Sequence, residues 1–183
     1  ITHGAGHTIR GGGSLLANTA GMVNDGTILG DGSTVLVIDP NGDDFINNNV
    51  LRATSAAGID LNSGTFTNNS TIEALAGSRV DLSAATVVGG TLSSTGTGDF
   101  NILSASTLDG VTIATGSTVN QSNAATVTIL GGLTNNGTWN NQGTVSNTSL
   151  SFNGSQILGG TGEVVFNNDP QSRITGFFGT VIT

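Results

Sequence analysis

The sequence predicts an all-β protein, a right-handed parallel β-helix (β-solenoid) of about nine coils of roughly 20 residues each. Three observations predict this fold: a composition poor in helix formers, a recurring turn motif, and pairs of apolar residues separated by one residue. The 183 residues are enough for one sizeable core, so we expect residues 1–183 to form a single β-solenoid module.

The composition disfavours both helices and disorder. The chain has 29 Gly and many Asn, Thr and Ser, which are weak helix formers, whereas Lys is absent and Glu, Arg, Gln and Met are rare. Hydrophobic residues make up 36% of the chain and supply enough apolar surface to drive packing. We therefore expect a folded chain of strands and turns.

The turn motif consists of Asn or Gly pairs, then Gly or Ser, then Thr and an apolar residue. Its copies are Asn24-Asp25-Gly26-Thr27-Ile28, Asn68-Asn69-Ser70-Thr71-Ile72, Gly89-Gly90-Thr91-Leu92, Asn135-Asn136-Gly137-Thr138-Trp139, Asn141-Gln142-Gly143-Thr144-Val145 and Gly159-Gly160-Thr161, with a looser copy at Asp109-Gly110-Val111-Thr112-Ile113. The spacing between most successive copies is about 21 residues or about twice that number. A spacing of this size is typical of the coils of a solenoid. Asn24, Asn68 and Asn135 are expected at equivalent corners, where stacked Asn side chains hydrogen-bond to one another.

Alternating apolar pairs indicate strands with one buried face. The pairs are Val35/Val37, Ile59/Leu61, Val80/Leu82, Phe100/Ile102, Val127/Ile129, Leu150/Phe152 and Val164/Phe166. Together with the turn motif they predict two short strands per coil. The segment Asp39-Pro40-Asn41-Gly42-Asp43-Asp44 contains Pro and Asn-Gly, so we expect a protruding loop there.

Several phrases of the chain resemble the parallel β-helix repeats of bacterial autotransporter-like and filamentous surface proteins. They are Gly6-His7-Thr8-Ile9-Arg10-Gly11, Thr65-Phe66-Thr67-Asn68-Asn69-Ser70-Thr71-Ile72-Glu73-Ala74, Leu133-Thr134-Asn135-Asn136-Gly137-Thr138, Ser155-Gln156-Ile157-Leu158-Gly159-Gly160-Thr161-Gly162 and Arg173-Ile174-Thr175-Gly176. The resemblance covers essentially the whole chain. It implies an adhesin-type tandem module, secreted to the bacterial cell surface, that is one unit of a longer repeat protein. It implies no particular ligand.

Charge argues against two classes of partner. The net charge of −8, with four Arg and no Lys, gives no cation cluster for nucleic acid and disfavours anionic membrane surfaces. No stretch approaches the roughly 20 uninterrupted apolar residues of a membrane-spanning helix. We expect no nucleic-acid partner and no membrane insertion of this segment.

Parallel β-helices also include polysaccharide-cleaving enzymes of the pectate-lyase type, which need clustered acids with Arg, Lys or His. Asp43 and Asp44 are adjacent and point to opposite sides of a strand, and Asp60 and Asp81 stack one coil apart, most simply as solvated residues beside Arg52 and Arg79. The other candidates, Asp99 and Asp109, are dispersed along the chain. The sequence therefore predicts no catalytic residue, although a polysaccharide-binding or polysaccharide-cleaving β-helix stays the alternative.

Metal, cofactor and phosphate sites are not predicted either. His3 and His7 have a spacing that suits a metal only on a helix, and a Gly-rich extended segment would separate them. Asp39, Asn41 and Asp43 begin like a calcium loop, but Asp44 and Val50 stand where that loop needs Gly and Glu. Gly11-Gly12-Gly13 and Gly96-Thr97-Gly98 lack the context of phosphate loops and are read as turns.

The remaining aromatic residues are assigned to packing and assembly. Trp139 is expected in the core, at the place of Ile28 and Ile72 in the repeat, rather than exposed to stack on a sugar. Phe177 and Phe178 are adjacent, so one of them is expected to cover the last coil or to meet a neighbour.

The predicted function is therefore a structural or adhesive extracellular rod without enzymatic activity. Neither end of the sequence supplies a cap, so we expect neighbouring copies or modules to stack head to tail into a filament. Surface glycans or other cells are further candidate partners. An ice-binding solenoid is a third class, suggested by abundant Thr, but the Thr residues are expected mostly at turns rather than in regular rows.

Overall fold

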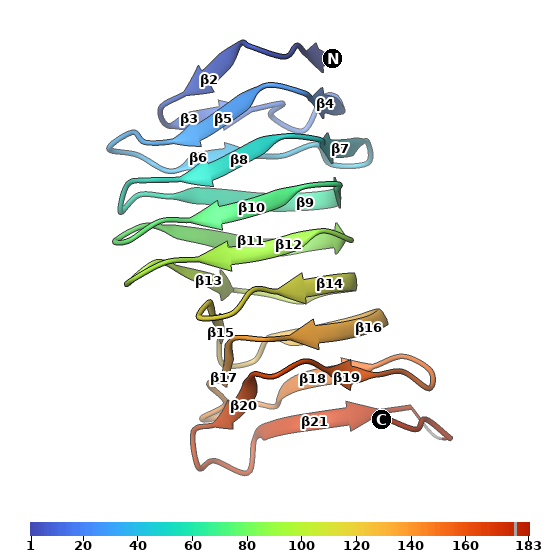
Figure 1. Ribbon diagram of the computed structural model, residues 1–183. Coiled ribbons are helices and arrows are strands. Elements are labelled where there is room, and N and C mark those ends of the chain that lie inside the picture. The colour runs from blue at the N-terminus through green and yellow to red at the C-terminus, as the bar shows by residue number, and fades with distance from the viewer. Residues whose placement is uncertain (178) are drawn as a thin grey trace.

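The computed structural model describes residues 1–177 and 179–183 and is a right-handed parallel β-helix. About eight turns, with equivalent residues about 21 positions apart, stack into a single column, and the described residues contain no helix (Figure 1). The predicted fold class is confirmed. The expected nine coils become about eight full turns followed by β21 (Ser172–Gly176), which begins another turn beneath β18 (Thr148–Phe152).

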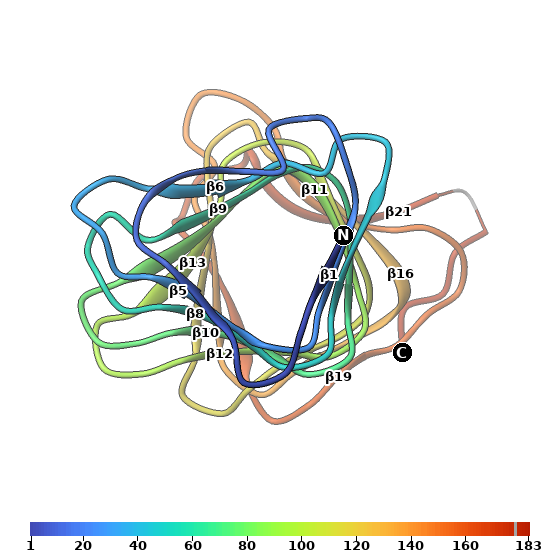
Figure 2. The ribbon, with the colours of Figure 1, turned by 90° about the horizontal axis from the view of Figure 1, so that it is seen from above.

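Each coil has three strands rather than the expected two, and Figure 2 shows the chain circling a common centre. The third strand comes from the turn motif itself. Its Thr is the first residue of a strand in which alternate residues point inward, as in β5 (Thr27–Gly30) with buried Ile28 and Gly30. Reading the motif only as a turn missed this strand.

The strands stack into three parallel faces, which we number in chain order. Face 1 contains β1 (Thr2–His3), β4 (Met22–Asn24), β7 (Asp44–Asn47), the second halves of β9 (Ile59–Asn68) and β11 (Arg79–Val88), the first halves of β14 (Ser106–Ile113) and β16 (Thr126–Asn135), β18 and β21. Face 2 contains β2 (Thr8–Arg10), β5, β8 (Val50–Ala53), β10 (Thr71–Ala74), β12 (Thr91–Ser94), the second halves of β14 and β16, and β19 (Leu158–Gly159). Face 3 contains β3 (Gly13–Leu15), β6 (Leu36–Ile38), the first halves of β9 and β11, β13 (Asp99–Ile102), β15 (Thr118–Gln121), β17 (Thr138–Asn141) and β20 (Glu163–Phe166).

Inward side chains from the three faces form one continuous core, because parallel pairing places equivalent residues directly above one another. On face 3, one inward column consists of Leu36, Ile59, Val80, Phe100, Val119, Trp139 and Val164. On face 2, the matching column consists of Ile9, Ile28, Leu51, Ile72, Leu92, Ile113 and Asn135. All members of the two columns are buried except Ile9 and Val164, which are partly buried.

Five of the seven predicted apolar pairs are buried, but two are not. Val35 and Val37 are only partly buried, because the strand is shifted by one residue and Leu36 and Ile38 point inward instead. A shift of one residue exchanges the two faces of a strand. Phe166 is exposed and Val164 is partly buried, because no described strand lies beneath β20.

Asn side chains stack at the corner between faces 1 and 2, as expected. Asn24 Nδ2 donates to Asn47 Oδ1 and Asn47 Nδ2 donates to Asn68 Oδ1, each over 2.9 Å, and all three side chains are buried. The ladder ends after Asn68, because Gly89 stands at the next register position and the adjacent Gly90, which has a positive φ, approaches Asn68 too closely for a Cβ atom. The expectation for Asn135 is wrong, because its register partner is Ile113, inside face 2.

Trp139 is fully buried, as predicted, but it lies in face 3 rather than at the place of Ile28 and Ile72. Its indole N–H donates to Gln121 Oε1 over 3.0 Å, which satisfies the one polar group of the ring. The motif copy at residues 135–139 spans the corner between faces 2 and 3, whereas the copy at residues 24–28 spans the corner between faces 1 and 2. The same residue types therefore serve two different corners.

The predicted loop around Asp39 is a turn between β6 and β7. Asn41 adopts a positive φ of 53°, and the Asp43 N–H donates to the Pro40 carbonyl over 3.2 Å. Residues 41–44 are exposed, but Pro40 is buried. The segment thus closes a corner of the coil and protrudes only at its tip.

Candidate functional site

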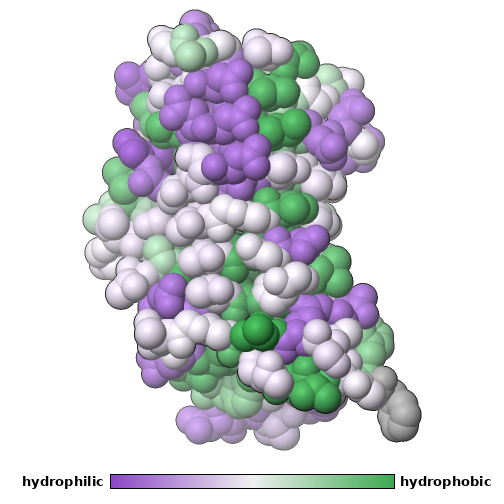
Figure 3. Space-filling model, turned by 45° about the vertical axis from the view of Figure 1, so that its right-hand side comes forward, coloured by the Kyte–Doolittle hydropathy of each residue, from purple (hydrophilic) through white to green (hydrophobic). Residues whose placement is uncertain are grey.

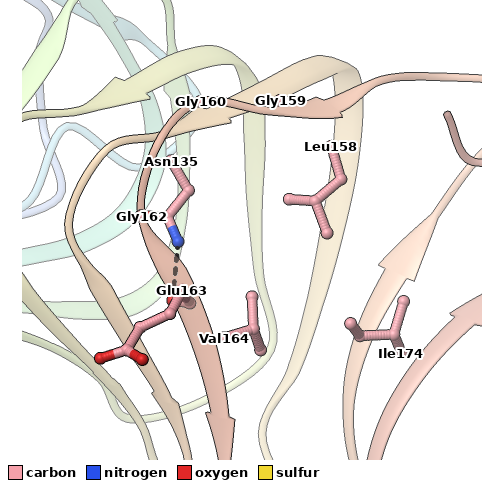
Figure 4. A pocket seen from close by; sticks show the side chains of 8 residues that line it. All are labelled: Asn135, Leu158, Gly159, Gly160, Gly162, Glu163, Val164 and Ile174. Carbon is pink, nitrogen blue, oxygen red and sulfur yellow. Dashed lines mark hydrogen bonds between the residues drawn. The ribbon is translucent and has the colours of Figure 1, made fainter.

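The C-terminal end of the column exposes the inside of the solenoid. Residues 181–183 lie beneath β19, where the Leu158 N–H donates to the Thr183 carbonyl, but no described strand pairs beneath β20 or β21. Leu158, Val164 and Ile174 continue three inward columns. They open into a cavity of about 270 Å³, which Figure 4 shows between the last strands. The cavity is lined by Asn135, Leu158, Gly159, Gly160, Gly162, Glu163, Val164 and Ile174.

Exposed apolar side chains are also present on the last strands of this end. Phe177, of which 60% is exposed, follows β21, and Phe166 and Val165 stand on β20. Phe177 does not cover the last coil, and the alternative that Phe178 does so lies outside the described residues. This end therefore combines unpaired strand edges with apolar surface, the two features that favour association.

The N-terminal end is also open among the described residues. Strands β1, β2 and β3 each pair with the coil below and have no described partner above. Ile1 is 71% exposed, and Ile9 and Leu15 are only partly buried. The two ends of the column therefore expose strands of the same three faces, and the strands of each face run in the same direction at both ends.

The acidic pair proposed from the sequence does stack, but not as two solvated residues. Asp60 and Asp81 are register partners on face 3, and Asp81 is buried while Arg79 Nε donates to its Oδ2 over 2.9 Å. Arg52 lies elsewhere, on face 2, where it pairs with Glu73. Asp81 is therefore held by a structural ion pair and is poorly placed to reach a sugar.

Burial raises the pKa of Asp60 above its usual value, and the hydrogen bond from Ser83 opposes this shift only in part. The carboxylate of Asp81 adds to the increase and Arg79 lowers it. The Oδ1 atom of Asp60 is buried and has no partner among the described residues. Asp60 is thus an under-satisfied group on the wall of face 3.

The other sequence candidates do not converge on a common site. Asp99 accepts hydrogen bonds from Asn101 and Asn120 in an outward polar stripe on face 3. Asp109 lies on face 1. Within the described residues, no group of three or more His, Cys, Asp or Glu side chains gathers around a common point.

His3 and His7 are brought together, against the expectation that an extended segment separates them. Gly6 has a positive φ and the His7 N–H donates to the Gly4 carbonyl, so the chain turns back on itself. His3 Nε2 and His7 Nδ1 lie 3.0 Å apart. The spacing argument failed because a Gly-rich turn, like a helix, can place two residues four positions apart side by side.

Threonine side chains form regular outward rows, which the sequence reading did not expect. On face 1, Thr65, Thr86, Thr107 and Thr128 are register partners in four consecutive coils, and Ser151 and Thr175 continue the row. A second row on face 2 contains Thr71, Thr91, Thr112 and Thr134. In the view of Figure 3, the surface is most hydrophilic toward the N-terminal end and more mixed below.

Comparison with known proteins finds no matching family model, no matching curated protein and no matching solved structure. Among the described residues, no helix is long and apolar enough to cross a membrane.

Proposed function

We propose that the chain is a structural or adhesive segment of an extracellular bacterial rod, and that it acts through its shape and its ends rather than through catalysis. The observation that carries the proposal is the open C-terminal end, where β20 and β21 have no described partner beneath them and Leu158, Val164 and Ile174 line a cavity. The secreted cell-surface location and the adhesin-like tandem arrangement are part of this proposal and rest on the resemblance of the repeat phrases.

The proposed partner is a neighbouring copy or module stacked head to tail. In the proposed joint, face 1 of one unit continues into face 1 of the next, so that β1 would pair beneath β21. Ile174 and Phe177 would then be covered by the partner. Such a contact joins two different surfaces and does not close on itself, so it generates a filament.

Electron microscopy and size-exclusion chromatography of the purified chain test this proposal. We expect thin fibres whose width is that of one solenoid, and we expect Ile174→Asp to abolish them, because it places a charge at the rim of the cavity. Leu103→Asp is the matched control, since Leu103 is exposed and follows β13 in a middle coil of the column. A monodisperse monomer at high concentration, or equal fibre loss in both variants, would contradict head-to-tail assembly.

Ice binding is a second candidate function, favoured by the aligned threonine rows on faces 1 and 2. Parallel stacking repeats their hydroxyl and methyl groups about every 4.8 Å along the column. Thermal hysteresis of the wild-type chain, lost in Thr107→Asp, would support it. If the wild-type chain shows no thermal hysteresis, the ice-binding function is excluded.

Polysaccharide cleavage, the alternative from the sequence, lacks such a favourable observation. Incubation with acidic polysaccharides tests it directly. If the wild-type protein cleaves the polysaccharide and the Asp81→Ala variant does not, the proposal of a non-enzymatic rod is wrong.

A further inference from the structure

Two histidine side chains, His3 and His7, meet at the N-terminal end of the column. His3 is 5% exposed and His7 is exposed. Their rings stand edge to face, with centroids 5.1 Å apart and ring planes at 88°. A ring nitrogen of each residue therefore faces the other.

The asparagine ladder fixes the proton on His3. Asn24 Nδ2 already donates to Asn47 Oδ1 over 2.9 Å and to the Val50 carbonyl over 3.1 Å, so Asn24 Oδ1 is the acceptor. His3 Nδ1 lies 2.7 Å from this oxygen and must donate to it. Neutral His3 then carries its free electron pair on Nε2, the atom that faces His7.

A histidine that binds a metal through one ring nitrogen usually donates the N–H of the other ring nitrogen to a fixed acceptor. Asn24 Oδ1 is such an acceptor for His3. The backbones of both histidines are also anchored to the coil below. The His3 carbonyl accepts from the Asp25 N–H, and the His7 carbonyl accepts from the Thr27 N–H. The site is thus built before any ligand arrives.

The distance between the two nitrogens suits a shared ion. Two imidazole ligands at about 2.0–2.1 Å from a tetrahedral zinc ion have nitrogens about 3.3 Å apart. The observed separation is 3.0 Å, so a small outward movement of the exposed His7 ring admits the ion. Of the three ion pairs among the described side chains, none involves either histidine.

We propose that His3 and His7 bind one divalent transition-metal ion of the zinc or copper class, with water completing the coordination. Two imidazoles select borderline ions over Mg²⁺ or Ca²⁺, which prefer oxygen ligands. His3 lies in β1, the strand that the proposed joint would pair with β21, so metal binding is measured both in the wild-type chain and in Ile174→Asp, and the two proposals can fail separately.

Isothermal titration calorimetry of the full chain with Zn²⁺, Cu²⁺ and Mg²⁺ tests the site. We expect one Zn²⁺ or Cu²⁺ per chain, no saturable Mg²⁺ binding, and weaker binding on acidification, because protons compete for both imidazoles. His7→Ala should lower the metal affinity at least about tenfold. Loss of an outer-sphere partner already lowers metal affinity by about that factor, and His7 is proposed as a direct ligand. Electron paramagnetic resonance of the Cu²⁺ complex should show nitrogen coupling that weakens in the same variant.

Two controls separate this site from non-specific binding to an acidic chain. Asp25→Asn removes the neighbouring carboxylate and should leave Zn²⁺ affinity unchanged. His7→Asn keeps a hydrogen-bonding side chain, so a stable fold with lost binding assigns the effect to ligation. Absence of saturable Zn²⁺ and Cu²⁺ binding, or equal affinity in wild type and His7→Ala, would overturn the proposal.

Discussion

Replacement of Leu82 tests the register of the core most directly. Leu82 is fully buried on face 3, between its register partners Leu61 and Ile102 in the adjacent coils. Leu82→Ala removes three carbon atoms, a transfer loss of about 2.5 kcal/mol at about 0.8 kcal/mol each. The remaining cavity raises the expected cost to about 3 kcal/mol. Leu82→Asp should cost more, because it places an unpaired charge against two apolar neighbours.

Urea denaturation followed by tryptophan fluorescence and circular dichroism measures these costs. Leu103→Ala is the matched control: its side chain is 48% exposed, while its backbone N–H still donates to the Leu82 carbonyl. We expect a change within about 0.5 kcal/mol. Thr97→Ala should be similarly small, since Thr97 is exposed and only accepts one hydrogen bond from the Gly77 N–H. Equal shifts for Leu82→Ala and Leu103→Ala would refute the inward assignment of Leu82.

Three further predictions follow from buried polar groups. The pKa of Asp60 is raised in the folded chain, so its favourable contribution to folding is present at acidic pH and is lost as the pH rises through the folded-state pKa. Asp60→Asn should therefore stabilise the fold at pH 7, where the charged carboxylate is partly buried, and lose this advantage at acidic pH; urea denaturation at both pH values measures the difference. Asn47→Ala should cost about 2–3 kcal/mol because it breaks the buried ladder, whereas Asn48→Ala in the exposed ladder beside it should cost under about 1 kcal/mol. Trp139→Phe should cost about 1–2 kcal/mol, because Gln121 Oε1 loses its indole donor. Trp139 is the only tryptophan, so circular dichroism alone follows the unfolding of this variant, and a neutral result would mean that this bond adds nothing.

The fold class was predictable because a solenoid repeats one structural unit. A coil period near 21 residues and alternating pairs such as Val80/Leu82 identify a stacked, half-buried strand without knowledge of any partner. The third strand was missed because it is short and directly follows turn residues, as in Thr27–Gly30. Short strands of this kind are stabilised by the coils above and below rather than by their own propensity.

The site was less predictable, because it depends on local geometry that the residue types do not determine. A turn through Gly4 and Gly6 decides whether His3 and His7 meet, and glycine permits either a turn or an extended chain. Likewise, the sequence around Asp81 does not distinguish a buried aspartate from a solvated one. Its burial and its ion pair with Arg79 are visible only in the structure.

Polar residues inside the core indicate where the coil opens. In β9 and β11 the chain passes from face 3 to face 1 as one continuous strand, whereas loops interrupt this corner after β15 and β17. At those two coils the inward position of Ile102 is taken by Gln121 and Asn141. Gln121 Nε2 donates to the carbonyls of Ala125 and Ser149, and Asn141 Nδ2 donates to the carbonyl of Thr148, at 2.9–3.0 Å. These are backbone acceptors near the interrupted corner, and each would be costly to bury unpaired. Loops also follow β6 and β13, where the inward residues are the apolar Ile38 and Ile102, so an amide at this position indicates a corner whose backbone carbonyls need partners rather than a weak core.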